Sequence, residues 1–455
     1  MSTLMRTRKP LWRRIVRTIV LAAIGLILLA IISLSVWNYI ESKELNKEIA
    51  KIRATGEPVT FEELKATLPP IDETQNAARY YQAGMSLLLQ AKDISNCLME
   101  FHKAFEKHPT SRPAEELVKQ ADRLLADNRE GLEMFDKGAA LPACRFDPGI
   151  RYGMTGILDQ SATIRQAARL LSLRTMARMV HGDGDGAVDS VISALRLTRL
   201  CDYPPMLTWF LVKTALVAMA YDNAGLVLHN AHPSDDALVR LQDELARSLS
   251  PDAWEKMIVG ERMYAVEVMR NVIPDQSRLE FVDVSPWPEA WPSSFRLSPW
   301  LRQWSVEQLR YLADARAAVK KPWPEAMDAI EAIKKPNGML AKILAPTYSR
   351  IAINRARVEA TVRCTMVAIA IERYRRTNGR LPDALSELTP KYIERVPLDP
   401  FSGKELLYHQ DNDSYVVYSI SENRQDDGGA LERPPGKDSL DLGVRIHLQP
   451  AGNSP

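Results

Sequence analysis

The residue types best suited to chemistry lie in one loop close to the C-terminus, residues 421–441. It contains four aspartates, Asp426, Asp427, Asp438 and Asp441. Calcium takes about six to eight oxygen ligands, mainly carboxylates and backbone carbonyls, and a loop that connects two strands offers both. The same loop holds three cations, Arg424, Arg433 and Lys437. The alternative interpretation is therefore a solvated acidic turn rich in glycine and proline.

A second group of carboxylates, Asp183, Asp185 and Asp189, lies in and just after a glycine-rich stretch in the middle of the chain, residues 181–186. An EF-hand loop would need further oxygens and a terminal glutamate at fixed spacing, and these are missing. We interpret this group as part of a polar turn between two helices.

Two histidines, His229 and His232, have the spacing that places side chains on one face of a helix. Pro233 and Ser234 follow at once, and this order is typical of a helix end. The sequence therefore predicts that Ser234 caps the next helix and that no metal is bound here.

Short catalytic motifs give no support to an enzyme. The sequence contains no Gly-x-Ser-x-Gly, no His-Glu-x-x-His and no phosphate-binding glycine loop, and its seven histidines are scattered. A pair of carboxylates from distant positions would suffice for acid–base work on a glycan, but no such pair can be named. We therefore expect binding rather than catalysis, with an envelope hydrolase as the alternative hypothesis.

The four cysteines, Cys97, Cys144, Cys201 and Cys364, are far apart and form no zinc-binding pattern. A disulfide is permitted outside the cytoplasm. The simpler interpretation is that each is a small buried residue on a helix face.

The first element that positions all of these residues is an uncharged stretch, residues 18–40. About 20 apolar residues suffice for a helix to cross the hydrocarbon core of a membrane. Six cations precede it without an acid, which predicts a cytoplasmic N-terminus. Trp37 and Tyr39 would lie at the far interface. A cleaved signal peptide is the alternative, although its apolar region is usually shorter.

The overall charge argues against a nucleic-acid partner. The formal net charge is +2, and the part that follows the apolar stretch carries about −4 once the six preceding cations are set aside. A negative outer part does not suit a phosphate backbone.

Most of the chain between residues 59 and 350 has the apolar spacing of helices that each bury one face. Thr60 and Glu63 have the spacing of a capping box. Residues 171–229 include Gly182, Ala187 and Ala194, and this stretch resembles one hairpin of a tetratricopeptide repeat (TPR). Glycine would end the first helix, and the two alanines would allow close helix packing.

A connector at residues 285–304 contains four tryptophans among several prolines: Trp287, Trp291, Trp300 and Trp304. They either fill the helical core or form an exposed aromatic surface for a partner or a membrane.

The last 100 residues combine a long helix with two predicted strands, residues 405–409 and 414–420, and a third at residues 443–448. The helix leads into the Asn-Gly-Arg-Leu-Pro run at residues 378–382, and a Pro-Leu-Asp-Pro-Phe turn follows at residues 397–401. This series resembles the C-terminal domain of the major pseudopilin of type II secretion. The whole chain also resembles a group of bacterial membrane-anchored envelope proteins that carry such a domain.

The resemblance implies a small antiparallel sheet and a calcium-binding loop, with Asn423, Asp427 and Asp441 as the side-chain ligands. It does not imply filament assembly. The helix at residues 355–378 carries charges such as Arg363 and Glu372, whereas the corresponding pseudopilin helix begins with an uninterrupted hydrophobic segment.

Together these features predict a mainly α protein with five parts. They are a cytoplasmic basic tail (residues 1–17), a transmembrane helix (18–40), a stalk in solvent (41–58), a TPR-like helical-hairpin domain (59–350) and a pseudopilin-like α+β domain (351–455). We expect a single-pass protein of the bacterial inner membrane, mostly periplasmic. It would act as a binding scaffold or adaptor for a protein partner, with a link to type II secretion. Contact surfaces would be the tryptophan-rich connector and the concave face of the helices.

Overall fold

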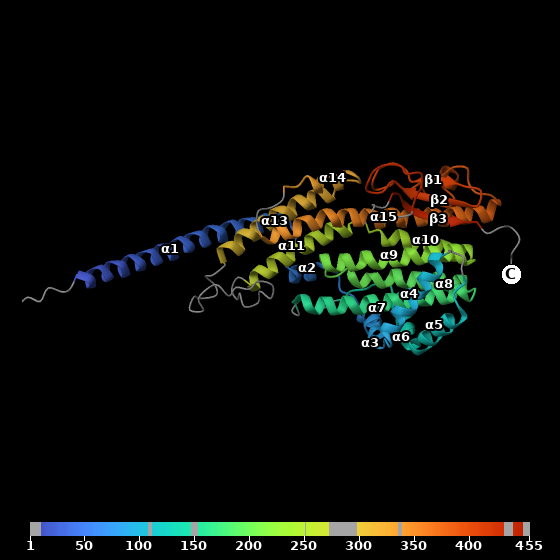
Figure 1. Ribbon diagram of the computed structural model, residues 1–455, viewed down its shortest axis with the longest axis horizontal. Coiled ribbons are helices and arrows are strands. Elements are labelled where there is room, and N and C mark those ends of the chain that lie inside the picture. The colour runs from blue at the N-terminus through green and yellow to red at the C-terminus, as the bar shows by residue number, and fades with distance from the viewer. Residues whose placement is uncertain are drawn as a thin grey trace, which may run out of the picture. The chain divides into compact units, whose positions relative to one another are not determined.

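The computed structural model describes residues 11–107, 112–146, 153–250, 252–272, 298–334, 339–431 and 440–448 (Figure 1). The helices in the first half are α1 (Leu11–Ala54), α2 (Phe61–Thr67), η1 (Glu73–Gln75), α3 (Ala77–Ser86), α4 (Ala91–Lys107), α5 (Glu115–Asp127), α6 (Arg129–Ala140), α7 (Gly153–Val180), α8 (Gly184–Leu197) and η3 (Thr198–Cys201). Those in the second half are α9 (Leu207–Asn230), α10 (Asp235–Ser248), α11 (Ala253–Val272), α13 (Ser298–Val319), α14 (Glu325–Glu331), α15 (Met339–Asn378) and η5 (Leu385–Leu388).

The three strands are β1 (Leu407–Gln410), β2 (Ser414–Ser419) and β3 (Leu442–His447), which form one antiparallel sheet in the order β1-β2-β3. Between residues 60 and 351, the part that the structure describes contains no strand. The prediction of a mainly α protein with a short C-terminal sheet is therefore confirmed.

α1 contains the uncharged stretch of the sequence. All side chains at positions 14–30 are exposed, and the most apolar window of the helix is 0% buried. α9 is also long and apolar enough to span a membrane, but 44% of its window is buried, as expected for a core helix. The chain thus has one exposed apolar helix near the N-terminus, which is the property of a membrane anchor or a signal sequence.

The chain divides into two compact units. Unit 1 comprises Met1–Ala66, Arg262–Ala313 and Lys335–Leu344, and unit 2 comprises Thr67–Glu261, Asp314–Lys334 and Ala345–Pro455. α11, α13 and α15 contribute residues to both. The boundary that we expected at residue 350 falls inside α15, and the unit that contains the sheet also contains the helical hairpins.

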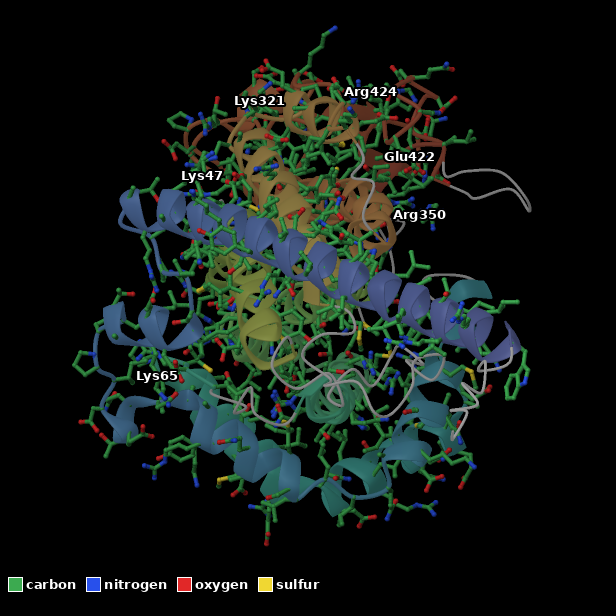
Figure 2. All side chains as sticks on the ribbon, turned by 90° about the vertical axis from the view of Figure 1, so that its left-hand side faces the viewer. Lys47, Lys65, Lys321, Arg350, Glu422 and Arg424 are labelled. Carbon is green, nitrogen blue, oxygen red and sulfur yellow. The ribbon has the colours of Figure 1, made fainter. Side chains whose placement is uncertain are left out.

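Unit 1 shows that residues 41–58 do not form a stalk in solvent. Leu45 of α1 is buried in a cluster with Val266 of α11 and Leu309 of α13, while the neighbouring Lys47 remains exposed (Figure 2). Ile49 and Ile52 pack against the same cluster. Apolar residues every three to four positions form a seam here, although the many charges around them suggested a solvated helix.

The capping box that begins α2 is present in unit 1. The backbone N–H of Glu63 donates to Thr60 Oγ1 at 3.2 Å, and Glu63 Oε2 accepts from the backbone N–H of Val59 at 2.7 Å. Gly56 precedes it with φ of +74°, a left-handed conformation that stops α1 and that glycine adopts without a steric penalty.

The hairpin of α7 and α8 in unit 2 follows the predicted logic. Gly182 has φ of +81°, and the amide of Asp183 donates to the Arg178 carbonyl at 2.9 Å, so that α7 ends in a Schellman-type turn. Ala187 and Ala194 are both buried, which lets α8 approach its neighbours closely.

A buried arginine links the same hairpin to α6. Arg174 of α7 donates two hydrogen bonds to the carboxylate of Asp136 on α6, both at 2.8 Å, and a third to Ser190 of α8 at 3.1 Å. The guanidinium is almost fully buried and therefore requires these partners.

α15 begins at Met339, well before the expected start near residue 355. Its backbone continues through Pro346, although a proline removes one hydrogen bond and normally interrupts a helix.

The C-terminal sheet packs against α15 (Figure 1). Tyr415 of β2 is fully buried and donates to Glu372 of α15 at 3.0 Å. β1 and β2 are joined by the predicted turn, in which the amide of Asp411 donates to the Ser414 carbonyl at 2.8 Å.

Asp399 is the residue that holds the Pro-Leu-Asp-Pro-Phe turn in place. Its buried carboxylate accepts from the amide of Phe401 at 3.0 Å, from Ser402 Oγ at 3.0 Å and from Ser419 Oγ of β2 at 2.6 Å. One side chain thus closes the turn and fastens it to the sheet.

Candidate functional site

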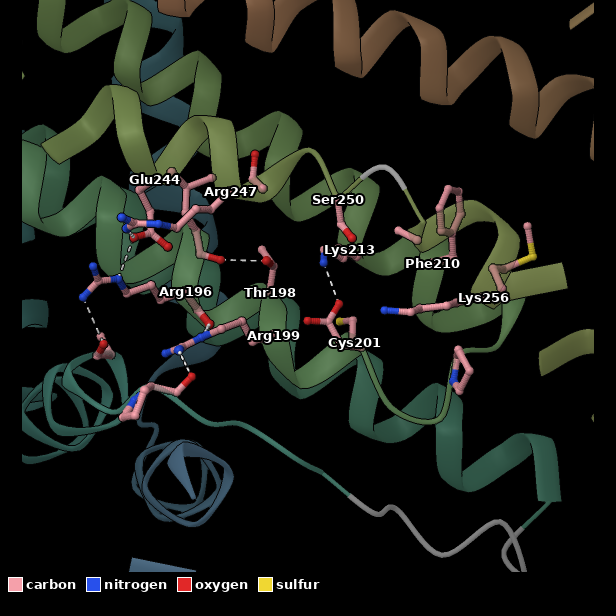
Figure 3. A pocket seen from close by; sticks show the side chains of 18 of the residues that line it. Arg196, Thr198, Arg199, Cys201, Phe210, Lys213, Glu244, Arg247, Ser250 and Lys256 are labelled. Carbon is pink, nitrogen blue, oxygen red and sulfur yellow. Dashed lines mark hydrogen bonds and ion pairs between the residues drawn. The ribbon is translucent and has the colours of Figure 1, made fainter. Parts of the chain in front are cut away.

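The described part of unit 2 contains a cavity of about 660 Å³, which we call the basic cavity (Figure 3). Five helix ends surround it: the ends of α6, of α8 with η3, and of α10, and the starts of α9 and α11. Its wall carries five cations, Arg196, Arg199, Lys213, Arg247 and Lys256. Only two carboxylates line it, Asp202 and Glu244.

Arg199 supports the cavity wall. It donates to the carbonyls of Gly138 at 3.3 Å and Leu141 at 2.8 Å, and also to those of Pro142 and Arg196. These include the orphan carbonyls at the end of α6, which a cation satisfies well. Its donors are therefore occupied by neutral oxygens, and its positive charge is not cancelled by a carboxylate among these contacts.

The cations at the rim are arranged differently. Arg247 is 65% exposed and donates to Glu244 at 3.3 Å, and Lys256 is 64% exposed and lies 2.6 Å from Asp252. Ion pairs this exposed are weak, so a ligand can compete for the same donors. Lys213 is more enclosed and lies 2.5 Å from Asp202.

The cavity also has an apolar floor, which includes Met206, Phe210 and Met257. Gly260 of α11 makes the close packing behind it possible, because a Cβ atom there would lie 1.7 Å from the carbonyl oxygen of Pro205. Cations around apolar side chains suit a ligand that combines carboxylates with apolar groups, such as an acidic peptide segment.

Glu261, the residue after Gly260 on α11, caps the start of α9 through a 2.8 Å hydrogen bond from the Leu207 amide to its Oε1. Burial raises the pKa of this carboxyl to about 7, and the Leu207 amide opposes the shift. Cys201, in the cavity wall, is buried, and burial raises the pKa of its thiol well above the ordinary range. A thiol held in its protonated form is not an activated nucleophile.

The three residues predicted as calcium ligands lie together in the loop between β2 and β3. Asn423 Nδ2 donates to Asp427 Oδ2 at 2.7 Å, and Asp441 Oδ2 accepts from the amides of Asp427 at 3.2 Å and Gly429 at 2.8 Å. Asp441 is buried. The three residues therefore lie close together, and their contacts in this structure are hydrogen bonds within the loop.

The electrostatics of this cluster are those of an anionic site. Burial raises the pKa of Asp441, and the nearby carboxylates of Asp427 and Asp426 raise it further, while the amide of Gly429 opposes them. The donors are all hard oxygens, which suits calcium. In the described residues, no three His, Cys, Asp or Glu side chains are placed to hold a metal together.

The cations of the loop do not all belong to this cluster. Arg424 donates to Asp328 of α14 at 2.5 Å, on the outer side of the C-terminal region (Figure 2). Arg445 of β3 instead donates to the Gly429 carbonyl at 2.9 Å. Arg433 and Lys437, which we counted against a calcium site, lie outside the described residues.

The aspartates of the α7–α8 turn each have a protein partner. Asp183 caps α8 by accepting from the Gly186 amide, Asp185 accepts from Ser234, and Asp189 lies 2.9 Å from Arg240. Asp185 and Asp189 thus hold the hairpin to the cap and the helix of α10, while Asp183 acts within the hairpin.

The histidine pattern marks a helix end. α9 ends at Asn230, and Ser234 caps α10 by accepting from the Ala237 amide at 3.2 Å, as predicted. His229 Nε2 lies 2.6 Å from the Arg445 carbonyl oxygen of β3.

Of the connector tryptophans, Trp287 and Trp291 lie outside the described residues. Trp300 makes an edge-to-face contact with Trp37 of α1, with 4.7 Å between ring centroids, and Trp304 is half-buried.

A second cleft bears on the hydrolase hypothesis. It measures about 340 Å³ and is lined by Tyr221, Asp222 and His229, among others. Asp222 is exposed to solvent there. Desolvation nevertheless raises the pKa of this carboxyl to about 6, a value that suits a general acid or base, so this cleft is where the hydrolase hypothesis would place its chemistry among the described residues.

Sequence reasoning missed the basic cavity altogether. Its lining residues are spread over positions 139–257, and each cation taken alone looks like an ordinary charge on a helix surface. The one available signal was the concentration of helix ends around the Pro204-Pro205 break. Of the cysteines, Cys97, Cys201 and Cys364 are buried and Cys144 is half-buried, and all four are free thiols.

Comparisons with known proteins add no relative: the chain matches no protein-family model, no curated protein and no solved structure.

Proposed function

We propose that the protein is a single-pass, membrane-anchored binding scaffold of the bacterial envelope, whose basic cavity takes an acidic segment of a partner protein. The observation that carries the proposal is the cavity itself, in which exposed rim cations surround an apolar floor. α1 would anchor the chain in the inner membrane, with residues 1–17 in the cytoplasm and the remainder periplasmic.

The anchor is supported by two independent properties of α1. Its most apolar window is 0% buried, and such exposure costs free energy in water but is favourable in lipid. The cations precede the apolar stretch, which favours a cytoplasmic N-terminus.

A link to type II secretion is part of this proposal and rests on the pseudopilin-like motifs alone. The turn at Asp399 and the sheet of β1–β3 have the expected order. On the same basis we propose that Asn423, Asp427 and Asp441 hold one calcium ion, which would fasten β3 to the loop.

The cavity is tested by fluorescence anisotropy with full-length protein in detergent micelles and a labelled octapeptide of alternating glutamate and leucine. Reversing both rim charges, with Arg247→Glu and Lys256→Glu together, is expected to weaken binding by about tenfold or more, or about 1.4 kcal/mol. The matched control reverses Lys103 and Lys119, which are similarly exposed cations on α4 and α5.

The control variant should bind as the unaltered protein does. Equal losses in both variants would reveal non-specific charge attraction and contradict the proposal. Reproducible turnover of an envelope glycan by the purified protein would favour the hydrolase hypothesis instead.

A further inference from the structure

The contacts between α1 and α13 in unit 1 determine how the two helices run. Trp37 contacts Trp300, Asn38 accepts a hydrogen bond from Arg302, and Glu48 pairs with Arg310 at 2.9 Å. The partners are separated by 262 to 264 residues in each case. The difference between the two residue numbers of each contacting pair is nearly constant, so the two helices run parallel. In antiparallel helices the residue numbers would rise on one helix as they fall on the other, and their sum would be constant instead.

This register places the start of α13 beside the end of the apolar stretch. Trp300 lies level with Trp37, and Trp304 lies one turn farther, near the level of Glu41. Protein contacts on α1 begin even earlier, because Ile31 and Leu34 are already half-buried whereas positions 14–30 are exposed.

The chemistry at this level is that of a membrane interface. Trp37 directs its ring N–H toward the charged half of α1 and donates to Glu41 Oε1 at 3.0 Å. Tyr39 is 69% exposed. At the other end of the apolar stretch, Trp12 is 61% exposed. It lies 25 residues before Trp37, or about 38 Å along a helix, which is close to the thickness of a bilayer with its interfaces.

We propose that the start of α13 rests in the bilayer interface, where Trp300 and Trp304 complete an aromatic collar with Trp37 and Tyr39. The inference rests on the proposed anchoring by α1. It adds that unit 1 contacts lipid directly through a second helix, because tryptophan and tyrosine favour the level of the headgroups. No flexible tether then separates the folded part of unit 1 from the membrane.

The test measures depth in vesicles of phosphatidylcholine and phosphatidylglycerol that contain the full-length protein. A fluorescent amino acid is placed at Tyr39, at Trp304 or at Ala313, an exposed position nine residues, or about 14 Å, beyond Trp304 on α13. Lipids with a nitroxide near the headgroup quench fluorophores at that depth. We expect equal loss of emission at positions 39 and 304 and none at position 313.

Two outcomes overturn the collar and are distinguishable. Quenching at position 39 without quenching at position 304 would leave the anchor intact but refute the contact of α13 with lipid. Quenching at neither position would refute the anchor as well. A second experiment uses the protein without substitutions, so that a folding defect of a variant cannot affect the result. A photoactivatable lipid should label residues 300–304 and should not label residues 306–320.

Discussion

The acidic loop between β2 and β3 and the basic cavity among the helix ends both concentrate charge, yet they use it differently. In the loop, Asp441 is buried and binds backbone amides of its own chain. In the cavity, Arg199 likewise binds backbone carbonyls, but Arg247 and Lys256 remain mostly in solvent. Charge that satisfies backbone groups stabilises the fold, whereas a cation held only in a weak, exposed ion pair is available to a ligand.

The largest loss of stability should come from removing a cation that binds backbone carbonyls, which is Arg199. Arg199→Met deprives several carbonyls at the end of α6 of their donors, and we expect a loss of about 4 kcal/mol in the free energy of unfolding. Arg247→Met removes the same charge from the rim and should change stability by less than about 0.5 kcal/mol. Chemical denaturation in detergent measures both. Similar losses of stability for the two variants would contradict the view that the wall cation stabilises the fold and the rim cation does not.

Glu261 is a buried carboxyl that binds a backbone amide, and its effect on stability should depend on pH. Its folded pKa of about 7 exceeds the ordinary 4.5, so the folded chain binds more protons than the unfolded chain between these values. The stability contributed by this group is complete below pH 4.5 and is lost as the pH rises to about 7. The loss is at most about 3 kcal/mol.

Glu261→Gln keeps an oxygen for the Leu207 amide and removes the ionisation. The variant should therefore be more stable than the unaltered protein at pH 8 and similar to it at pH 4.5, as measured by melting temperature. A constant difference at both pH values would show that the carboxyl does not titrate with folding.

The effect of calcium on stability tests whether the acidic loop between β2 and β3 binds the ion. An ion bound only to the folded state adds about 1.4 kcal/mol at ten times its Kd, so millimolar calcium should raise the melting temperature of the full-length protein. Asp427→Ala should abolish the rise. Asp413→Ala, an exposed aspartate in the turn before β2, is the control and should retain it. A rise that persists in Asp427→Ala would place the ion elsewhere.

The smallest expected effect concerns Arg424. Because it pairs with Asp328 and not with the carboxylates around Asp441, Arg424→Ala should leave the response to calcium unchanged. If calcium instead bound several-fold more tightly to this variant, the guanidinium would have to act on the loop carboxylates directly.

Features that depend on neighbouring residues could be predicted from the sequence. Gly182, Ser234 and the turn before β2 all act within a few positions of their partners, and the structure has them as expected. Asn423, Asp427 and Asp441, named from the pseudopilin resemblance, also lie together although two of them are 14 residues apart, and that they hold calcium stays a prediction.

Features that depend on distant contacts could not be predicted. The burial of Leu45 requires Val266 and Leu309, which lie more than 200 positions away. The basic cavity requires five helix ends to meet, and no local pattern encodes that meeting. α15 also continues through Pro346, although proline has the lowest helix propensity of all residues and local sequence alone would favour a helix end there.

The most direct test of the central claim is photocrosslinking in cells, with the crosslinker at Lys256 in the cavity rim or at Arg424 in the acidic loop. We predict that position 256 captures one discrete protein partner, that capture is lost when Arg247→Glu is added, and that position 424 captures none. Capture from position 424 alone, or capture from position 256 that is insensitive to Arg247→Glu, would contradict the assignment of the basic cavity as the binding site.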